Sequence, residues 1–382
     1  MDLMKILFWG SLLMLVYVYI GYPILVFLLS LLRNKKVRKQ TFQPYVTILI
    51  AAYNEEENIE ETIKNKLDLN YPREKTEIIV VSDGSTDKTE DIVKKYDSRG
   101  VKLVRQETRC GKTAALNIAA PHAVGDILVF SDANSIYDKN ALQKLVDNFA
   151  DPTVGYVTGK MIYTNPDGTI VGDGCSAYMK YENFLRKYET NIGSVVGVDG
   201  GIDAIRKKLY QPMNQDQLPD FILPLKVIEQ GFRVVFEPEA ILKEKSLNTA
   251  GKEYKMRVRV TLRALWALYD MAKLLNFKKY GLYAWQLLSH KSLRYLCFMF
   301  LITFYISNLY LWPENLFIKI IFVLQNAFYV NALVAHIKEK SGNSSGPLYL
   351  PYFFTLINVA AAHAFIKFLL GQKIVTWKPR EG

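Results

Sequence analysis

Cysteine is scarce in this chain. The 382 residues include three cysteines, Cys110, Cys175 and Cys297, and these are widely spaced. They are too few for a disulfide framework and do not have the spacing of a closed zinc site. The sequence therefore excludes a disulfide-stapled secreted domain and a structural zinc module, and it fits a reducing compartment.

Acidic residues are outnumbered by basic ones. The chain has 37 Asp and Glu against 48 Lys and Arg, which leaves a net charge of +11. Such an excess suits nucleic acid, acidic lipid or phosphorylated substrates, so the distribution of the charge decides between them. Much of it lies beside long apolar segments. We therefore expect membrane lipids and a phosphorylated substrate as partners, and no nucleic acid.

Charged residues are absent from Ile6 to Leu32. This apolar run exceeds the roughly 20 residues that a spanning helix needs, and it is too long for a signal-peptide core. Five basic residues follow it within Arg33–Lys39. By the positive-inside tendency, the next domain lies in the cytoplasm. We expect a transmembrane helix over residues 1–33 and a basic cytoplasmic linker over residues 34–44.

Three further apolar stretches lie near the other end, at Leu293–Leu311, Leu316–Val334 and Leu348–Leu370. Each is close to the length of a membrane span, although buried helices of a soluble protein are the alternative. We expect transmembrane segments over residues 293–371 and a basic tail over residues 372–382. Four spans would leave this tail outside, whereas its positive charge favours the inside. Either one stretch is re-entrant or interfacial, or the charge bias is overridden.

The middle of the chain alternates between two hydrophobic periods. β-branched apolar runs predict strands, and apolar residues at helical spacing follow the first two runs, at Ile59–Leu67 and Thr89–Tyr96. The expected strands are Val46–Ala52, Glu77–Ser82, Val101–Arg105 and Ile127–Ser131. This alternation predicts an α/β domain over residues 45–250, with a mostly parallel sheet and helices on both faces.

An aspartate directly follows each of two expected strands. Asp83 comes after Val-Val-Ser and Asp132 after Val-Phe-Ser. Ligands of parallel sheets bind at the carboxyl ends of the strands, so both acids are expected at one site. For either residue alone, an Asx-turn or a helix cap is the competing interpretation.

An ordered set of short motifs carries a family resemblance. The motifs are Ala-Ala-Tyr-Asn-Glu at 51–55, Val-Ser-Asp-Gly-Ser-Thr-Asp at 81–87, Gly-Lys-Thr-Ala-Ala-Leu-Asn at 111–117, Ser-Asp-Ala-Asn at 131–134, and Asp-Gly-Gly-Ile-Asp at 199–203. Together with the terminal apolar segments, they resemble glycosyltransferase family 2. The similarity is to its membrane-bound branch, which includes poly-N-acetylglucosamine, chitin-oligosaccharide and hyaluronan synthases. The resemblance implies a Rossmann-like GT-A fold and inverting transfer from a nucleotide-sugar.

The resemblance also implies the general base. Transfer with inversion needs a group that takes the proton of the acceptor hydroxyl. Asp220 matches the second acid of the pair that the family uses for this, whereas Pro219 replaces the first. Asp216 lies nearby as a second candidate, and the alternative role for either acid is in a turn or a helix cap.

A divalent metal is expected beside the donor diphosphate. Mg²⁺ or Mn²⁺ prefers oxygen ligands and commonly bridges carboxylates and phosphates. The acid-x-acid signature of the family appears here as Asp132-Ala133-Asn134, with an amide in place of the second acid. We expect Asp132 and Asn134 as metal ligands, with one negative charge fewer than usual.

The remaining donor contacts are implied motif by motif. By resemblance, Asp83 sits against the uracil ring, and the first motif adds Ala51, Tyr53 and Glu55. Lys112 offers a point charge to the phosphates, although a solvated loop lysine is the alternative.

Processive members of the family carry a Gln-x-x-Arg-Trp signature after the base, and this chain lacks it. In its place, Glu253–Leu275 is predicted to be a basic amphipathic helix, followed by a second one over Gly281–Tyr295, so residues 251–292 are expected at the membrane interface. Arg259 and Arg263, with Arg257 nearby, either contact lipid or reach the donor diphosphate. His290, which stands alone, is expected to be structural.

These expectations converge on an inverting hexosyl- or N-acetylhexosaminyltransferase in the cell membrane, with its catalytic domain in the cytoplasm. The expected donor is a UDP-sugar such as UDP-GlcNAc, and the acceptor is a polysaccharide or a glycolipid. A polyprenyl-phosphate sugar transferase is the enzyme alternative. A non-catalytic membrane scaffold of the same fold is the other, supported by the missing second metal acid and the missing Gln-x-x-Arg-Trp.

Overall fold

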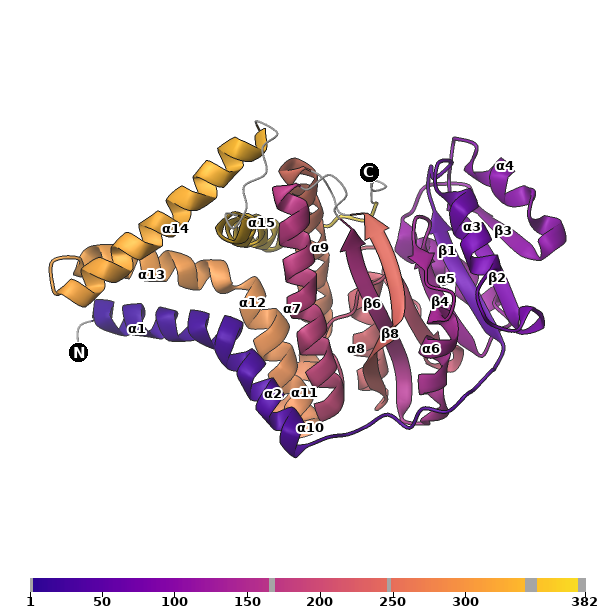
Figure 1. Cartoon of the computed structure of the whole chain (residues 1–382), viewed down its shortest axis with the longest axis horizontal. Helices are drawn as coiled ribbons and strands as arrows, with labels where there is room; N and C mark the ends of the chain where they lie inside the picture. The colour runs from indigo at the N-terminus through magenta and orange to yellow at the C-terminus, as the bar shows by residue number, and fades with distance from the viewer. Residues whose placement is uncertain (1–2, 165–168, 246–248, 341–348, 377–382) are drawn as a thin grey trace.

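The computed structural model describes residues 3–164, 169–245, 249–340 and 349–376. A twisted sheet with its covering helices forms one side of the molecule, and long helices extend away from it on the other side (Figure 1). Two helices, α7 and α9, stand between these parts. Residues 33–45 run from the end of α2 along one edge of the molecule to β1.

The sheet contains eight strands in the order β3-β2-β1-β4-β7-β6-β8-β5. β1 pairs in parallel with β2 and β4, β2 with β3, and β6 with β8, whereas β7 and β5 are antiparallel to their neighbours. The strands are β1 (Val46–Ala52), β2 (Thr76–Asp83), β3 (Val101–Gln106), β4 (Ile127–Asp132), β5 (Ile136–Tyr137), β6 (Val154–Thr164), β7 (Ile202–Arg206) and β8 (Arg233–Lys245). The predicted α/β class with a mostly parallel sheet is confirmed.

Alternating side chains of β1 enter two different cores. All seven residues of β1 are buried, because helices cover both faces of the sheet. Leu49 and Ala51 belong to one hydrophobic cluster, while Ile48 and Ile50 belong to the other. This division follows from the two-residue repeat of a strand. It explains why β1 is a continuous apolar run in the sequence.

Helices on the two faces come from different parts of the chain. The face of Ile48 is covered by α3, α4 and α6, and the face of Leu49 by α5, α8 and α9. The bounds of these helices are α3 (Ile59–Leu67), α4 (Thr89–Lys94), α5 (Lys112–His122), α6 (Ala141–Asp147), α8 (Pro219–Glu229) and α9 (Ala250–Asp270). The predicted basic helix is thus α9, and one of its faces is part of the core of the α/β domain.

The long helix α7 (Ile170–Ile192) and α9 connect the sheet to the apolar helices. Tyr22 and Val26 of α2 pack against Leu185 of α7. Leu262 of α9 packs against Ala360 of α15. The remaining helices are α1 (Leu3–Val16), η1 (Tyr17–Gly21), α2 (Tyr22–Leu32), α10 (Phe277–Tyr280), α11 (Leu282–Leu287), η7 (Leu288–Ser292), α12 (Leu293–Tyr295), α13 (Cys297–Leu311), α14 (Leu316–Lys340) and α15 (Tyr349–Leu369).

Within the described residues, three helical stretches are long and apolar enough to cross a membrane: Leu3–Leu32, Leu316–Glu339 and Tyr349–Leu369. A fourth candidate is a broken pair, Leu282–Tyr295 and Cys297–Leu311, bent by 59° at the break. The expected span beginning at Leu293 is therefore interrupted at Leu296. The end of the predicted basic tail, residues 377–382, lies outside the described residues.

Candidate active site

The carboxyl ends of three neighbouring parallel strands form the floor of the site. Ala51 on β1 stands opposite Asp132 on β4, and Ala52 stands opposite Ser82 on β2. Asp83 and Asp132 therefore lie at the same edge of the sheet, as their sequence setting predicts. Asp83 is buried, while the side chain of Asp132 remains 37% exposed.

Asp83 organises the loop that precedes α5. Its carboxylate accepts hydrogen bonds from the side-chain amide of Gln106 at 2.8 Å and from the backbone amides of Cys110 and Gly111 at 2.8 and 2.9 Å. Burial raises the pKa of this carboxyl, although the two backbone bonds oppose the shift. Gly111 is left-handed (φ +94°), which favours glycine. The acid predicted to contact uracil thus also places Lys112.

Lys112, the first residue of α5, joins the two principal acids. Its ammonium nitrogen lies 2.6 Å from Oδ1 of Asp132 and 3.6 Å from Oδ1 of Asp220, and it donates to the carbonyl oxygen of Gly200 at 3.4 Å. Burial lowers the pKa of Lys112, but the two carboxylates outweigh burial and raise it above its ordinary value. Lys112 is therefore a fixed cation between the acids and not a solvated loop lysine.

Asp220 lies in the first turn of α8. Pro219 occupies the first position of this helix, where its missing N–H leaves no hydrogen bond unmade. Asp220, the next residue, lines the cavity with 24% of its side chain exposed. The second base candidate, Asp216, is bound instead to the ammonium of Lys373 at 2.5 Å.

A cavity of about 240 Å³ connects these residues to α7, α9 and α12. Among the predicted donor contacts, its lining includes Ala51, Glu55, Lys112, Asp132, Asn134, Arg259 and Arg263. Burial raises the pKa of Glu55 to about 7, although a hydrogen bond from Asn58 opposes the shift. Tyr53 and Asp83 are not part of this lining; Asp83 is fully buried, and the ring of Tyr53 lies 3.6 Å from the guanidinium of Arg109.

The three arginines of α9 have different environments. Arg263 is buried and donates to the hydroxyl of Thr113 at 2.8 Å and to the carbonyl oxygen of Gln215 at 3.1 Å. Burial, with the neighbouring Arg259, lowers its pKa to about 10. Arg257 is paired with Glu253 at 2.7 Å. Both predicted donor-binding arginines line the cavity, and Arg263 also supports the loop before α8.

The oxygen atoms of Asp132 and Asn134 suit a hard divalent cation. Within the described ranges, no group of three or more His, Cys, Asp and Glu side chains is arranged around one metal position. Mg²⁺ and Mn²⁺ nevertheless bind proteins through one or two carboxylates when substrate phosphates supply further oxygens. The residues present therefore fit a metal that is completed by the donor diphosphate.

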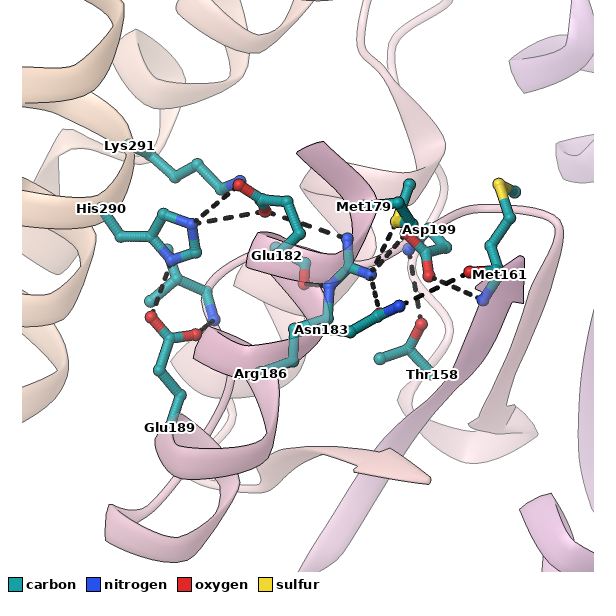
Figure 2. A network of polar contacts seen from close by, with 12 residues as sticks. Thr158, Met161, Met179, Glu182, Asn183, Arg186, Glu189, Asp199, His290 and Lys291 are labelled. Atoms are coloured by element: carbon teal, nitrogen blue, oxygen red, sulfur yellow. Dashed lines mark hydrogen bonds and ion pairs between the residues drawn. The ribbon is translucent and has the colours of Figure 1, made fainter. Parts of the chain in front are cut away.

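Two groups of residues were not predicted to be part of the site. Asp203 is fully buried, and burial, with the nearby charge of Asp220, raises its pKa to about 8. Glu182, Arg186 and Asp199 form a buried network on the α7 side of the cavity (Figure 2). Neither Glu182 nor Arg186 lies in a recognisable sequence motif. Asp199 is the first residue of the Asp-Gly-Gly-Ile-Asp motif.

Residues 47–211 match the family model described as "Glycosyl transferase family 2". The chain is 30% identical over 252 residues to the poly-beta-1,6-N-acetyl-D-glucosamine synthase of Staphylococcus aureus strain COL, covering 62% of this chain and 59% of that protein. It is 29% identical over 231 residues to the probable glycosyltransferase YdaM of Bacillus subtilis, covering 56% and 54%. The chain thus spans between half and two thirds of the length of these curated relatives.

A solved structure is similar along almost the whole chain. The mannosyltransferase PcManGT from Pyrobaculum calidifontis, in complex with GDP-Man and Mn²⁺, superposes with a TM-score of 0.72 at 22% identity. The match covers 96% of this chain and 99% of that one. At this identity the likeness establishes a shared fold. Residues 47–211 therefore match glycosyltransferase family 2, the chain has a GT-A-like fold, and it is related to the poly-β-1,6-N-acetyl-D-glucosamine synthases.

Proposed function

We propose that this chain is an inverting glycosyltransferase that moves a sugar from a UDP-sugar to a glycan or a lipid-linked acceptor. The observation that carries the proposal is the meeting of Asp132, Lys112 and Asp220 in one cavity at the carboxyl ends of β1 and β4. The name of the staphylococcal relatives supports UDP-GlcNAc as the donor.

Asp220 would act as the general base. Its carboxylate takes the proton of the acceptor hydroxyl while that oxygen attacks the anomeric carbon from the face opposite the leaving group. The bond from the anomeric carbon to the diphosphate breaks, and the nucleoside diphosphate leaves with the negative charge. Lys112 and Arg259 line the same cavity and would stabilise that charge.

Asp132 and Asn134 would hold a divalent metal ion together with the diphosphate. Bound there, Mg²⁺ or Mn²⁺ would supply positive charge to the leaving group. The Mn²⁺ that accompanies GDP-Man in the structurally similar mannosyltransferase supports this proposal. The residues of the chain would orient the diphosphate through Lys112 and leave Asp220 available to the acceptor.

The acceptor would enter from the side of the long helices. Tyr178 and Met179 of α7 and Tyr295 of α12 also line the cavity. Rings and thioethers of this kind suit the apolar faces of sugars and the start of a lipid chain. The candidate spans next to this region support a cell-membrane location, with the α/β domain on the cytoplasmic side.

Transfer in membrane vesicles tests the proposal. Vesicles containing the full chain are offered radiolabelled UDP-GlcNAc or GDP-Man with Mn²⁺, and products are separated into polymeric and lipid-extractable fractions. We expect incorporation from UDP-GlcNAc. Label found on a lipid phosphate would identify a polyprenyl-phosphate sugar transferase, and no incorporation from any nucleotide-sugar would favour the scaffold.

The variant Asp220→Asn tests the base. The amide preserves size and cannot accept the proton, so transfer should fall by about 100-fold or more while UDP binding persists. Glu229→Gln is the matched control, because Glu229 lies on the same helix and pairs with Lys273 away from the cavity. More than about a tenth of wild-type activity in Asp220→Asn would show that another group is the base.

A further inference from the structure

The loop from Gly197 to Gly201 lies directly against Asp220. Gly200 is left-handed (φ +85°), and a Cβ placed on it would lie 2.1 Å from Oδ2 of Asp220. The carbonyl oxygen of Gly200 accepts from the ammonium of Lys112 at 3.4 Å. The contact with Asp220 is the closer of the two, so the position of this loop limits where the proposed base can lie.

A buried ion pair holds this loop. Nη1 of Arg186 lies 2.5 Å from Oδ1 of Asp199, and Nε of Arg186 donates to the carbonyl oxygen of Gly197 at 3.0 Å. The side chains of Arg186 and Asp199 are 4% and 1% exposed. Oδ2 of Asp199 also accepts from the backbone amide of Met161 at 3.2 Å. Figure 2 shows Asp199 between Arg186 and the backbone of β6.

Glu182 lies one helical turn before Arg186 and faces several basic side chains. Its carboxylate is 4.0 Å from Arg186 and 3.4 Å from both Lys291 and His290, and it also contacts the guanidinium of Arg294. Burial opposes its ionisation, but Lys291 and Arg294 outweigh burial and hold its pKa well below the ordinary value. Glu182 therefore remains charged and links Arg186 to the helices around η7.

The network continues to the N-terminal apolar helix. Nδ1 of His290 lies 2.7 Å from Glu189, which also accepts from the hydroxyl of Tyr22 at 2.5 Å. Side chains of α2, η7 and α7 are thereby connected to the loop beside Asp220 (Figure 2 shows the part from Glu189 to Asp199).

Stability alone does not explain such a network. Removing ions from water costs several kcal/mol each, and a well-packed apolar replacement is often neutral or stabilising. An ion pair that also forms hydrogen bonds with two backbone groups fixes the orientation of these groups, whereas apolar contacts do not. Its contacts here are with Gly197, at the start of the loop that carries Gly200, and with Met161 of β6.

We propose that Arg186 and Asp199 are positioning residues that hold the Gly197–Gly201 loop, and through it Asp220, in the geometry for transfer. Glu182 keeps Arg186 in place and makes this geometry depend on the packing of η7 and α12 against α7. The inference rests on the proposed function, because it assigns to Asp220 the role of the base.

The test compares Arg186→Met, Arg186→Lys, Asp199→Asn and the double variant Arg186→Met/Asp199→Asn in full-length protein. Turnover is expressed per UDP-binding site, with the donor KM and thermal unfolding measured alongside. Turnover should fall by about tenfold or more in the methionine and asparagine variants, with a donor KM within about twofold of wild type. The double variant should be no worse than the more damaged single variant, because both lose the same ion pair. Arg186→Lys, which keeps the charge, should recover part of the turnover.

Lys187→Met is the matched control, because Lys187 is the exposed neighbour of Arg186 on α7 and should behave as wild type. Asp199→Asn replaces a single oxygen atom with an amide nitrogen. This variant therefore tests the proposal by itself if the arginine variants do not accumulate. Normal turnover per UDP-binding site in Asp199→Asn would overturn the proposal. A raised donor KM at unchanged turnover would also overturn it, since the pair would then serve donor binding.

Gly200→Ala tests the contact between the loop and Asp220. Its Cβ would push Asp220 away and strain a left-handed residue, so turnover should fall as in Asp199→Asn. Asp220→Asn, measured in parallel, separates the two proposals. If Asp220→Asn is inactive while Asp199→Asn and Gly200→Ala are normal, only the positioning role fails. If Asp220→Asn is active, the assignment of the base fails.

Discussion

The ammonium of Lys112 lies 2.6 Å from Oδ1 of Asp132, the carboxylate proposed to bind a divalent metal. A cation of the protein thus already faces this acid, and the same ammonium is 3.6 Å from Asp220. Because Asn134 replaces the second metal acid, the negative charge around the proposed metal position is low. The donor diphosphate must therefore supply much of the attraction for the metal.

Removal of the metal ligand should abolish the metal dependence of donor binding. Asp132→Ala is expected to bind UDP equally well with and without Mn²⁺, since the proposed metal would be held by this carboxylate together with the diphosphate. Asp83→Ala should weaken UDP under both conditions, because its loss also releases the backbone amides of Cys110 and Gly111. Isothermal titration calorimetry with UDP, with and without Mn²⁺, measures this.

Asn134→Asp is the complementary variant for the metal site. It adds the missing negative charge and should increase the tightening of UDP by Mn²⁺. The same metal dependence in Asp132→Ala and Asp83→Ala would exclude Asp132 as a metal ligand. An unchanged response in Asn134→Asp would place the metal away from residue 134.

Lys112→Met should weaken the binding of UDP by about tenfold, equivalent to about 1.4 kcal/mol, because the phosphates lose a fixed cation and the two acids lose their counter-charge. Lys112→Arg should recover part of the affinity. The control is Lys102→Met, since Lys102 is 60% exposed and pairs with Glu77 far from the cavity. Competition of UDP with a fluorescent UDP analogue measures the affinities, and wild-type affinity in Lys112→Met would remove Lys112 from the donor site.

The first half of the fold could be predicted from the sequence because its strands are apolar runs separated by clear turns. β1 to β4 agree with the predicted ranges to within one residue at either end. β6, β7 and β8 were not predicted from periodicity. Their pairing joins segments far apart in the chain, and β6 and β8 contain register shifts. Local patterns do not encode such long-range pairing.

The candidate active site could also be predicted only in part from local sequence patterns. Spacing indicated Asp83 and Asp132, because each follows a strand directly, whereas Asp220 came from family resemblance alone. The pair Arg186–Asp199 was not predicted. Glu182 and Arg186 are four apart on a helix, a pattern that usually indicates an exposed ion pair. Only the packing of α7 against the sheet and η7 buries these charges, and packing of this kind is not visible in local sequence.

Asp203 should make the stability of the fold depend on pH. Its pKa is raised to about 8 from an ordinary value of 3.8, mainly by burial and then by Asp220. The folded state therefore holds a proton that the unfolded state has released, so this group's contribution falls as pH rises from about 4 to about 8. Asp203→Asn imitates the protonated acid and should reduce this loss of stability. Denaturant unfolding at pH 5 and pH 8 measures the difference.

Asp97→Asn is the control for the pH prediction, because Asp97 is exposed. This variant should show the same pH dependence of stability as wild type. The two variants and wild type share all other titrating groups, including Glu55, so the comparison isolates residue 203. If Asp203→Asn loses as much stability as wild type between the two pH values, then Asp203 is ionised in the folded protein.

The last prediction separates two roles of the α9 arginines. An arginine that only attracts lipid is replaced well by lysine, since charge alone counts for anionic headgroups. A guanidinium that binds a diphosphate, or several groups at once, is not replaced, because ammonium lacks the planar fork. Arg263 donates to Thr113 and to the backbone around Gln215, and Arg259 lines the cavity. Neither environment resembles a lipid surface.

Arg259→Lys should therefore lower transfer by about tenfold, or about 1.4 kcal/mol in the transition state, with no change in thermal stability. Arg263→Lys should lower both transfer and stability, because one ammonium cannot make all the bonds of the buried guanidinium. Lys255→Arg, at an exposed position of the same helix, is the control. All variants should stay in the membrane fraction, where transfer is measured at matched protein content. Wild-type transfer in both lysine variants would mean that these arginines contribute only charge, and the lipid interpretation of α9 would then stand.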